Sequence, residues 1–218
     1  MKKFLRSLLI CVAVALCGSN AHSQTTASYF FSAFTAPYTS ISATGTPAAI
    51  SADDITQTNI PIGFTFVYCG TSYTQLAACS NGFLNFANTG AAPWTNMTGS
   101  IASAGWILPF WDDLHGSGHL AYYQTVGAAP NRIFIFEWNN FHHFSTSGNG
   151  NLQVKLYEGS NMIDFCYGVN SYGSPSGSIG ITNTAADVRT LPTFGAAPIP
   201  TMTFNVGTGF PAANQVYR

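Results

Sequence analysis

The chain has 218 residues and a formal charge of −1, and only 7% of its residues are Asp, Glu, Lys or Arg, against ~25% in typical soluble proteins. Seven basic residues are too few to neutralise a run of phosphates, which argues against a nucleic-acid partner. Aromatic residues reach 14%, which excludes a disordered chain, and the scarcity of Glu, Lys and Arg argues against long helices.

A signal peptide is predicted for residues 1–23. A basic segment at residues 1–6 precedes an apolar run, Leu8 to Leu16, that is too short to span a bilayer. Ala21-His22-Ser23 then forms a small-residue cleavage pattern. We therefore expect a secreted protein, extracellular or periplasmic, that begins near Gln24 and has no stable membrane insertion. Such a chain keeps four basic residues against eight acidic ones, so an anionic membrane surface is also disfavoured.

The first part of the exported chain, residues 24–59, is rich in Ser, Thr and Ala. Residues 28–34 could form a first strand, whereas residues 39–58 are typical of a loop with at most one short strand. We assign residues 24–59 to the same domain as the rest of the chain, residues 60–218, because no linker or repeat separates them.

From Ile60 onward, large apolar residues alternate with small or polar ones, which is the period of a half-buried strand. The clearest hairpin joins residues 152–157 to residues 162–167 through Gly159-Ser160. Short strands with turns about every ten residues predict an all-β fold, a β-sandwich or jelly-roll-like pair of antiparallel sheets. The expected strands, apart from the first, are residues 60–68, 73–79, 83–86, 106–111, 119–125, 132–138, 152–157, 162–167, 177–182 and 201–204.

Three cysteines lie outside the predicted signal peptide: Cys69, Cys79 and Cys166. In an oxidising compartment this odd number favours one disulfide bond and one buried free thiol, and the alternative is three reduced buried cysteines. Paired C-x-x-C spacings of a zinc site are absent from the sequence. Which two cysteines would pair depends on strand register and is left open.

Four segments together resemble a known family. They read "IPIGFTFVYCGTSYTQLAACSNGFLNF", "ILPFWDDL", "YYQTVGAAPNRIFIFEWNNF" and "LQVKLYEGSNMIDFCYG", and "GSIGITN" follows. In this order they are similar to the nidogen-like extracellular β domain found in many secreted bacterial proteins, over residues 60–183. The resemblance implies a β-sandwich of extracellular, adhesive or matrix-type proteins without a defined catalytic residue set. The expected partner of this chain is an extracellular glycan or a matrix or surface protein. Cys69 and Cys79 depart from the ordinary strand residues of that pattern.

Two adjacent carboxylates, Asp112 and Asp113, follow Trp111 and precede a glycine-rich loop. Paired carboxylates in a loop could hold Ca²⁺, which takes six to eight oxygen ligands. The alternative is that one Asp caps backbone N–H groups of the turn. A transition-metal site built from His115, His119, His142 and His143 is disfavoured, because adjacent residues of a strand point to opposite faces.

The segment Trp138-Asn139-Asn140-Phe141 combines flat aromatic rings with amide side chains. Such a combination could stack against and hydrogen-bond a glycan, whereas the alternative is core packing.

Three functional hypotheses remain. The leading one is a non-enzymatic extracellular module for adhesion or for contact with a ligand, glycan or matrix. A second is a secreted carbohydrate-active enzyme that would pair Glu137 with Asp112 or Asp113, and the alternative for Glu137 is an exposed or Arg132-paired side chain. A third is a structural envelope or matrix protein that associates with itself through open strand edges.

Overall fold

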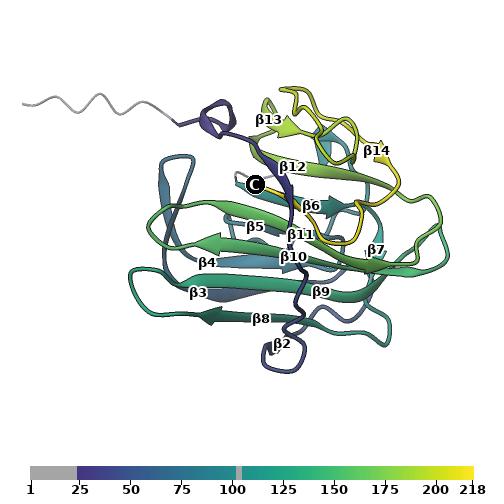
Figure 1. Ribbon diagram of the computed structural model, residues 1–218, viewed down its shortest axis with the longest axis horizontal. Helices are drawn as coiled ribbons and strands as arrows, with labels where there is room; N and C mark the ends of the chain where they lie inside the picture. The colour runs from purple at the N-terminus through teal and green to yellow at the C-terminus, as the bar shows by residue number, and fades with distance from the viewer. Residues whose placement is uncertain (1–23, 102–104) are drawn as a thin grey trace, which may run out of the picture.

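A computed structural model describes residues 24–101 and 105–218, so the predicted signal peptide lies outside the described residues. The chain forms two antiparallel sheets that pack face to face as a β-sandwich (Figure 1). Among the described residues, no helix is long and apolar enough to cross a membrane. The strands are β1 (Ala33–Thr35), β2 (Thr46–Ala48), β3 (Thr56–Tyr68), β4 (Thr71–Cys79), β5 (Phe83–Asn85), β6 (Trp106–Trp111), β7 (Leu114–His115), β8 (Ala121–Val126), β9 (Ile133–His143), β10 (Asn149–Tyr157), β11 (Ile163–Asn170), β12 (Ser176–Thr184), β13 (Asp187–Thr190), β14 (Gly207–Thr208) and β15 (Gln215–Tyr217), with short 3₁₀ turns at Thr26–Ser28 and Thr98–Ser100.

The front sheet in Figure 1 has the strand order β1-β15-β11-β10-β9-β8-β2, and β7 also pairs with β9. Its centre is the predicted hairpin of β10 and β11, in which Val154 faces Phe165 and Leu156 faces Ile163. Because side chains alternate between the two faces of a strand, this register places all four on the inner face. The expected hairpin and its apolar stripe are therefore confirmed.

The back sheet has the order β13-β12-β6-β5-β4-β3, and β14 also pairs with β12. Strand β3 lies at its edge, and its pairing with β4 slips twice, between Gln57 and Ile60 and between Pro61 and Phe66. Two carbonyl groups of this edge accept hydrogen bonds from side chains of the other sheet. Thr125 Oγ1 donates to Ile62 O over 2.7 Å, and the Arg132 guanidinium donates to Gly63 O over 2.6 Å.

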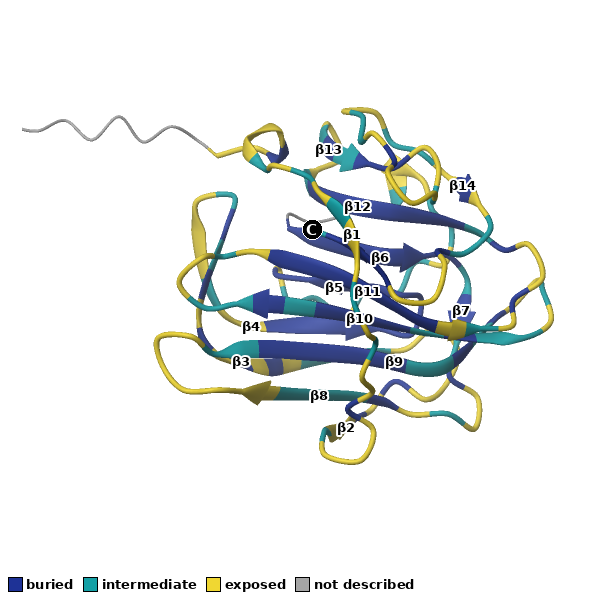
Figure 2. Cartoon of the chain, in the orientation of Figure 1, coloured by how far each residue is buried: buried dark blue, intermediate teal, exposed yellow. Residues whose placement is uncertain are grey.

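The core lies between the sheets and is dominated by aromatic and branched side chains that are fully buried, such as Phe136, Val154 and Ile107 (Figure 2). A second, smaller apolar cluster covers the outer face of the back sheet around Phe83, whose ring stacks on Trp106 with centroids 4.3 Å apart. Strand β6 is therefore buried on both faces, which explains why it is an unbroken apolar run.

The N-terminal segment crosses the outer face of the front sheet on its way to β2 (Figure 1). Residues 36–45, which we call the strap, lie over β9 and β10. The Tyr38 hydroxyl donates a hydrogen bond to Glu137 of β9, and Gln153 of β10 donates to Thr39 O over 2.8 Å. The strap therefore buries polar residues of the front sheet that would otherwise face water.

Two expected strands are wrong in extent. Residues 28–34 contribute only the start of β1 at Ala33, after a 3₁₀ turn that ends at Ser28. Residues 201–204 form a loop with a single bridge from Thr201 to Thr190, and Phe204 turns back to pack on Trp111 with centroids 5.8 Å apart. Periodicity misled in both places, because aromatic residues here pack against sheets instead of extending them.

Candidate metal centre

One end of the sandwich is built around the turn Ser80-Asn81-Gly82. Gly82 has a φ of +73°, and a Cβ there would lie 2.1 Å from Phe110 O, so only glycine fits against the backbone of β6. Ser80 exchanges two hydrogen bonds with Ile55, through its backbone N–H (2.9 Å) and through its Oγ (3.0 Å). The turn therefore fixes the position of the loop that precedes β3.

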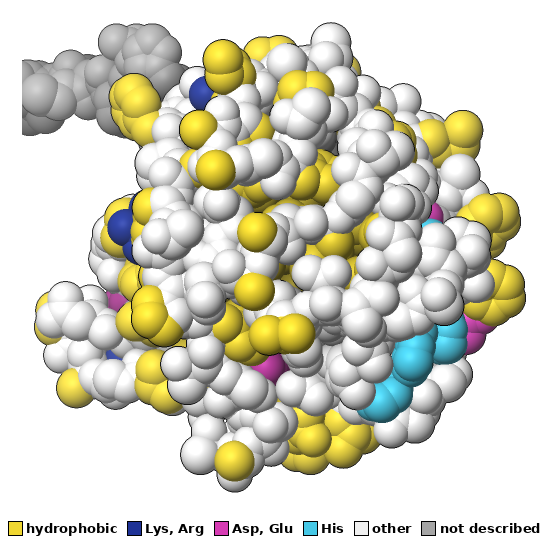
Figure 3. Space-filling view, turned by 45° about the vertical axis from the view of Figure 1, so that its right-hand side comes forward, with side chains coloured by type: hydrophobic (Ala, Val, Ile, Leu, Met, Phe, Trp, Pro, Cys, Tyr) yellow, Lys and Arg dark blue, Asp and Glu magenta, His cyan; other side chains and the backbone are white. Residues whose placement is uncertain are grey.

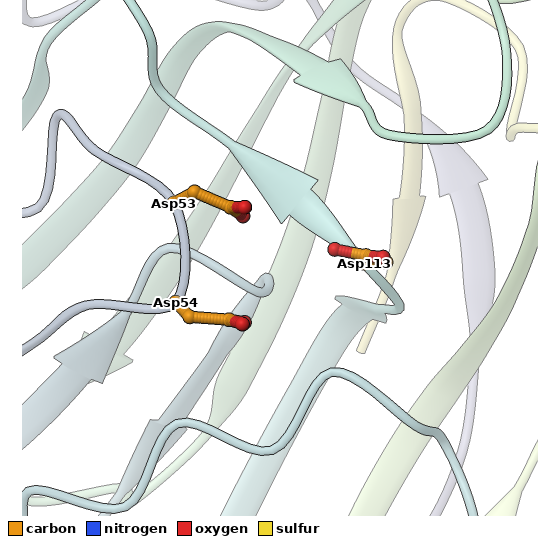
Figure 4. A group of neighbouring side chains, drawn as sticks. All are labelled: Asp53, Asp54 and Asp113. Atoms are coloured by element: carbon orange, nitrogen blue, oxygen red, sulfur yellow. The ribbon is translucent and has the colours of Figure 1, made fainter.

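That loop carries two carboxylates, Asp53 and Asp54, which meet Asp113 at the end of β6 (Figure 4). One oxygen from each side chain lies within 4.8 Å of the others. We call these three residues the aspartate cluster. Asn81 Nδ2 donates to Asp54 Oδ1 over 2.8 Å, and Asn81 Oδ1 is buried without a hydrogen-bond partner in the described structure. The cluster is thus anchored to the turn on one side and open to solvent at Asp53 and Asp54.

The oxygens of the aspartate cluster lie close enough together to contact one hard cation. Oxygens bound to one Ca²⁺ lie ~2.3–2.6 Å from the ion, so they can be at most ~5 Å apart, and this cluster meets that limit. The pKa of Asp113 is raised by partial burial and then by the neighbouring charges of Asp53 and Asp54. A divalent cation would remove this repulsion. With one oxygen each, the three carboxylates would supply three of the roughly six to eight oxygen ligands of Ca²⁺, and water would complete the shell.

Asp112, which the sequence paired with Asp113, is not part of the cluster. It is 8% exposed and accepts hydrogen bonds from Ser176 Oγ (2.6 Å) and from the backbone N–H of Asp113 (2.8 Å). His143 Nε2 lies 3.6 Å from its Oδ2. Asp112 therefore caps the turn and ties β6 to β9 and β12, as the alternative expectation had it, and only Asp113 of the two predicted calcium ligands lies in the aspartate cluster.

Asp53 and Asp54 were missed because the sequence shows them only inside a Ser/Ala-rich loop. Their place beside Asp113 follows from two long-range contacts, the Ser80–Ile55 pair and the Asn81–Asp54 bond. The adjacent carboxylates directly before the first strong strand were the available signal. Nothing local to that loop pointed to a partner 59 residues further along the chain.

The prediction that residues 138–141 stack against a glycan is wrong, because both aromatic rings of this segment are fully buried. Trp138 and Phe141 are both 0% exposed, and Trp138 Nε1 donates to Cys79 O inside the core over 2.8 Å. Asn140 has a φ of +62° and marks an irregularity in β9, where its N–H donates to Asn151 Oδ1 over 2.9 Å. Asn139 Nδ2 reaches Ser40 Oγ in the strap over 3.3 Å. The two asparagines therefore make hydrogen bonds within the fold, to β10 and to the strap.

Glu137 is also fully buried, under the strap. Its carboxylate accepts hydrogen bonds from the Tyr38 hydroxyl (2.7 Å), the Ile41 backbone N–H (2.7 Å) and the Ser40 hydroxyl (3.1 Å). The expectation that Glu137 is exposed or pairs with Arg132 is wrong, because Glu137 is buried and Arg132 pairs with Glu158. A carboxylate enclosed in this way cannot act on a sugar in a cleft, so the hypothetical pair with Asp112 or Asp113 is not formed.

Three histidines gather on the surface beside this end of the molecule (Figure 3). The ring of His142 lies 5.3 Å from that of His115 and 4.8 Å from that of His119, measured between centroids. His143 instead faces Asp112, so the adjacent histidines do point to opposite sides. The pKa of His119 is lowered by partial burial and by the proximity of His142 and His115. The two neighbouring rings thus disfavour protonation of His119.

All three cysteines of the described residues are free, so the expected disulfide is wrong. Cys69 precedes the nine-residue strand β4 and Cys79 is its last residue, so at ~3.4 Å per residue the strand separates them by about 30 Å. Cys166 pairs in register with Gln153 under the strap, on the far side of the front sheet. Burial is the largest cause that raises the pKa of each thiol to about 11, so none is an activated nucleophile.

Comparison with known proteins gives one match. The family described as NIDO related matches residues 28–218. No curated protein and no solved structure matches the chain.

Proposed function

The chain belongs to the NIDO-related family, and from this premise we propose that it is a secreted, non-enzymatic module that makes adhesive or ligand contacts outside the cell, with Ca²⁺ bracing the loops of its aspartate cluster. The observation that carries the proposal is the convergence of Asp53, Asp54 and Asp113 from two separate loops at one end of a rigid sandwich. Loops at the end of a β-sandwich are the usual place for contact residues, because the sheets hold them still.

The motif residues of the family resemblance support this reading. The SNG turn, the end of β6 and the tryptophan of β9 meet at the same end of the fold, through Gly82 against Phe110 O and Trp138 Nε1 on Cys79 O. These contacts position loops and leave no reactive group exposed among those motif residues. The sealed position of Glu137 argues against the carbohydrate-active alternative.

Calcium binding gives the first test. The raised pKa of Asp113 means that the folded protein holds its proton more tightly than the unfolded chain. Without calcium, the cluster therefore destabilises the fold at neutral pH, and less so as the pH falls through this raised pKa. At 10 mM Ca²⁺ and a dissociation constant of ~10⁻⁴–10⁻³ M, we expect the melting temperature to rise by roughly 3–10 °C, with less effect from Mg²⁺.

The variant Asp113→Asn separates a cation site from a merely structural carboxylate. It should raise the melting temperature measured in EDTA, because it removes repulsion, and it should abolish the gain with calcium. Glu158→Gln is the matched control, since it removes a carboxylate that lies outside the cluster and should keep the calcium gain. A wild-type protein with no response to calcium, or an Asp113→Asn variant that keeps it, would refute the calcium part.

The adhesive part requires a separate measurement. The purified protein should be screened against a glycan array and immobilised extracellular matrix proteins, with calcium and with EDTA. We expect binding that Asp113→Asn weakens. A screen without any hit, together with monomeric behaviour in sedimentation, would refute the adhesive role even if calcium binds.

A further inference from the structure

A cavity of about 520 Å³ opens between the two sheets, at the edge formed by β11 and β15 on one side and β12 and β13 on the other. Its size falls within the ~300–1,000 Å³ typical of small-molecule sites. Apolar side chains from both sheets line it, among them Ile163, Phe165, Tyr217, Ile179, Ile181 and Leu191. It shares no residue with the aspartate cluster.

The core is incompletely filled at this edge. Ile163, Phe165 and Ile181 keep 6–8% of their surface exposed, whereas Phe136 and Val154 in the middle of the front sheet keep none. These inward-facing side chains leave apolar surface open where the sheets should seal against each other, which is unfavourable by ~25 cal/mol for each Å² left in water. An apolar ligand would recover that free energy.

The N-terminal segment forms one wall of the cavity. Tyr29 packs on Tyr68 with centroids 5.7 Å apart, and Phe31 packs on Tyr217 at 5.9 Å. Between them, Phe30 also lines the cavity yet is 97% exposed. A phenylalanine held in water at the opening of an apolar cavity extends the apolar surface outward.

One cation lines this cavity without a carboxylate partner. Among the arginines of the described residues, Arg132 pairs with Glu158 and Arg218 pairs with Asp164, but no acidic side chain pairs with Arg189. The Nε atom of Arg189 is buried without a hydrogen-bond partner, and its Nη1 reaches only Ala27 O, at 3.4 Å. A guanidinium has five N–H donors arranged to match a carboxylate, and most of these are unused here.

We propose that this cavity binds a single-chain amphiphile with a carboxylate head, its apolar tail between the sheets and its head against Arg189. The apolar lining selects the tail. The guanidinium selects a negative head over a neutral or positive one, because its unused N–H donors match the two oxygens of a carboxylate. The binding site is separate from the loop contacts proposed above and does not depend on them.

Isothermal titration of the delipidated protein tests the proposal with three probes of equal tail length: decanoate, decanol and decyltrimethylammonium. We expect decanoate to bind at least ~10-fold more tightly than decanol, equivalent to ~1.4 kcal/mol, and the cationic probe to bind most weakly. Arg189→Gln should weaken decanoate binding by the same factor and leave decanol unchanged. Arg189→Lys should retain part of the preference.

Two further variants keep the result interpretable. Lys155→Gln removes a cation that does not line the cavity and should bind decanoate as wild type does. Ile163→Trp fills the cavity and should abolish binding of both decanoate and decanol, with the fold checked by its melting temperature. Absence of decanoate binding, equal affinity for decanoate and decanol, or an Arg189→Gln variant that binds decanoate normally would overturn the proposal.

Discussion

Replacement of Glu137 by glutamine should be among the most damaging single-atom changes available in this protein. The carboxylate is fully buried and accepts three hydrogen bonds of 2.7–3.1 Å from the strap. Hydrogen bonds to a charged group contribute ~1.5–3 kcal/mol each. The glutamine amide keeps one acceptor oxygen, but its NH₂ group would face a second donor, either the Ile41 N–H or the Tyr38 hydroxyl. We therefore expect Glu137→Gln to lower the free energy of unfolding by about 2–4 kcal/mol.

Urea unfolding, monitored by tryptophan fluorescence, measures this loss of stability, because all four tryptophans lie in the β-sandwich domain. Tyr38→Phe removes one donor and should cost less, about 1–2 kcal/mol. Because the two residues are in direct contact, the double variant should show a coupling energy of ~0.5 kcal/mol or more. Glu158→Gln makes the same chemical change in an ion pair that water reaches at Arg132, whose side chain is 32% exposed, and should have a smaller effect. A Glu137→Gln variant with a free energy of unfolding within ~0.5 kcal/mol of wild type would refute the account of the strap.

Two other predictions follow from the same end of the fold. Gly82→Ala should lower the yield of folded protein, or lower the free energy of unfolding by more than ~2 kcal/mol, because the new Cβ would lie 2.1 Å from Phe110 O and the φ of Gly82 is +73°. Gly90→Ala is the control, because a Cβ at Gly90 would have nothing within 4 Å. Equal stability of the two variants would contradict the prediction. His119 has a lowered pKa in the fold, so stability should fall as the pH drops from neutral through the ordinary histidine pKa of 6.5 toward the lowered value. His119→Asn should flatten that decline in thermal melts between pH 7.5 and 5.5, and an identical pH dependence in both proteins would exclude the histidine cluster as its source.

Sequence patterns predicted the sandwich because its strands are long and its apolar stripes are unambiguous. The hairpin of β10 and β11 was predicted with its turn, and its register follows from its apolar faces, since a slip of one residue would turn Val154 and Phe165 away from the core. The short strands β2, β7 and β14 have two or three residues each, too few for any period to show. Their existence depends on neighbours that are distant in the chain.

The candidate site was predicted only in part, for a related reason. Asp113 was recognised because it stands beside another carboxylate, but its actual partners come from a different loop. The strap explains the other errors. In an alternating strand, a polar residue is predicted to face solvent even where another segment covers that face. Glu137 was therefore predicted to be exposed, although the strap covers it. Composition and periodicity describe one strand at a time, whereas burial depends on what lies over it.

The edge strand β3 has a consequence for behaviour at high concentration. With charged residues at only 7% of the chain, electrostatic repulsion between molecules is weak, and a thirteen-residue strand with free carbonyl groups would recruit further copies into fibrils. Pro61 has no N–H to offer, and Ile62 O and Gly63 O are already occupied by Thr125 and Arg132. Thr125 and Arg132 thus withdraw two carbonyl groups of this edge from pairing with a further copy of the chain.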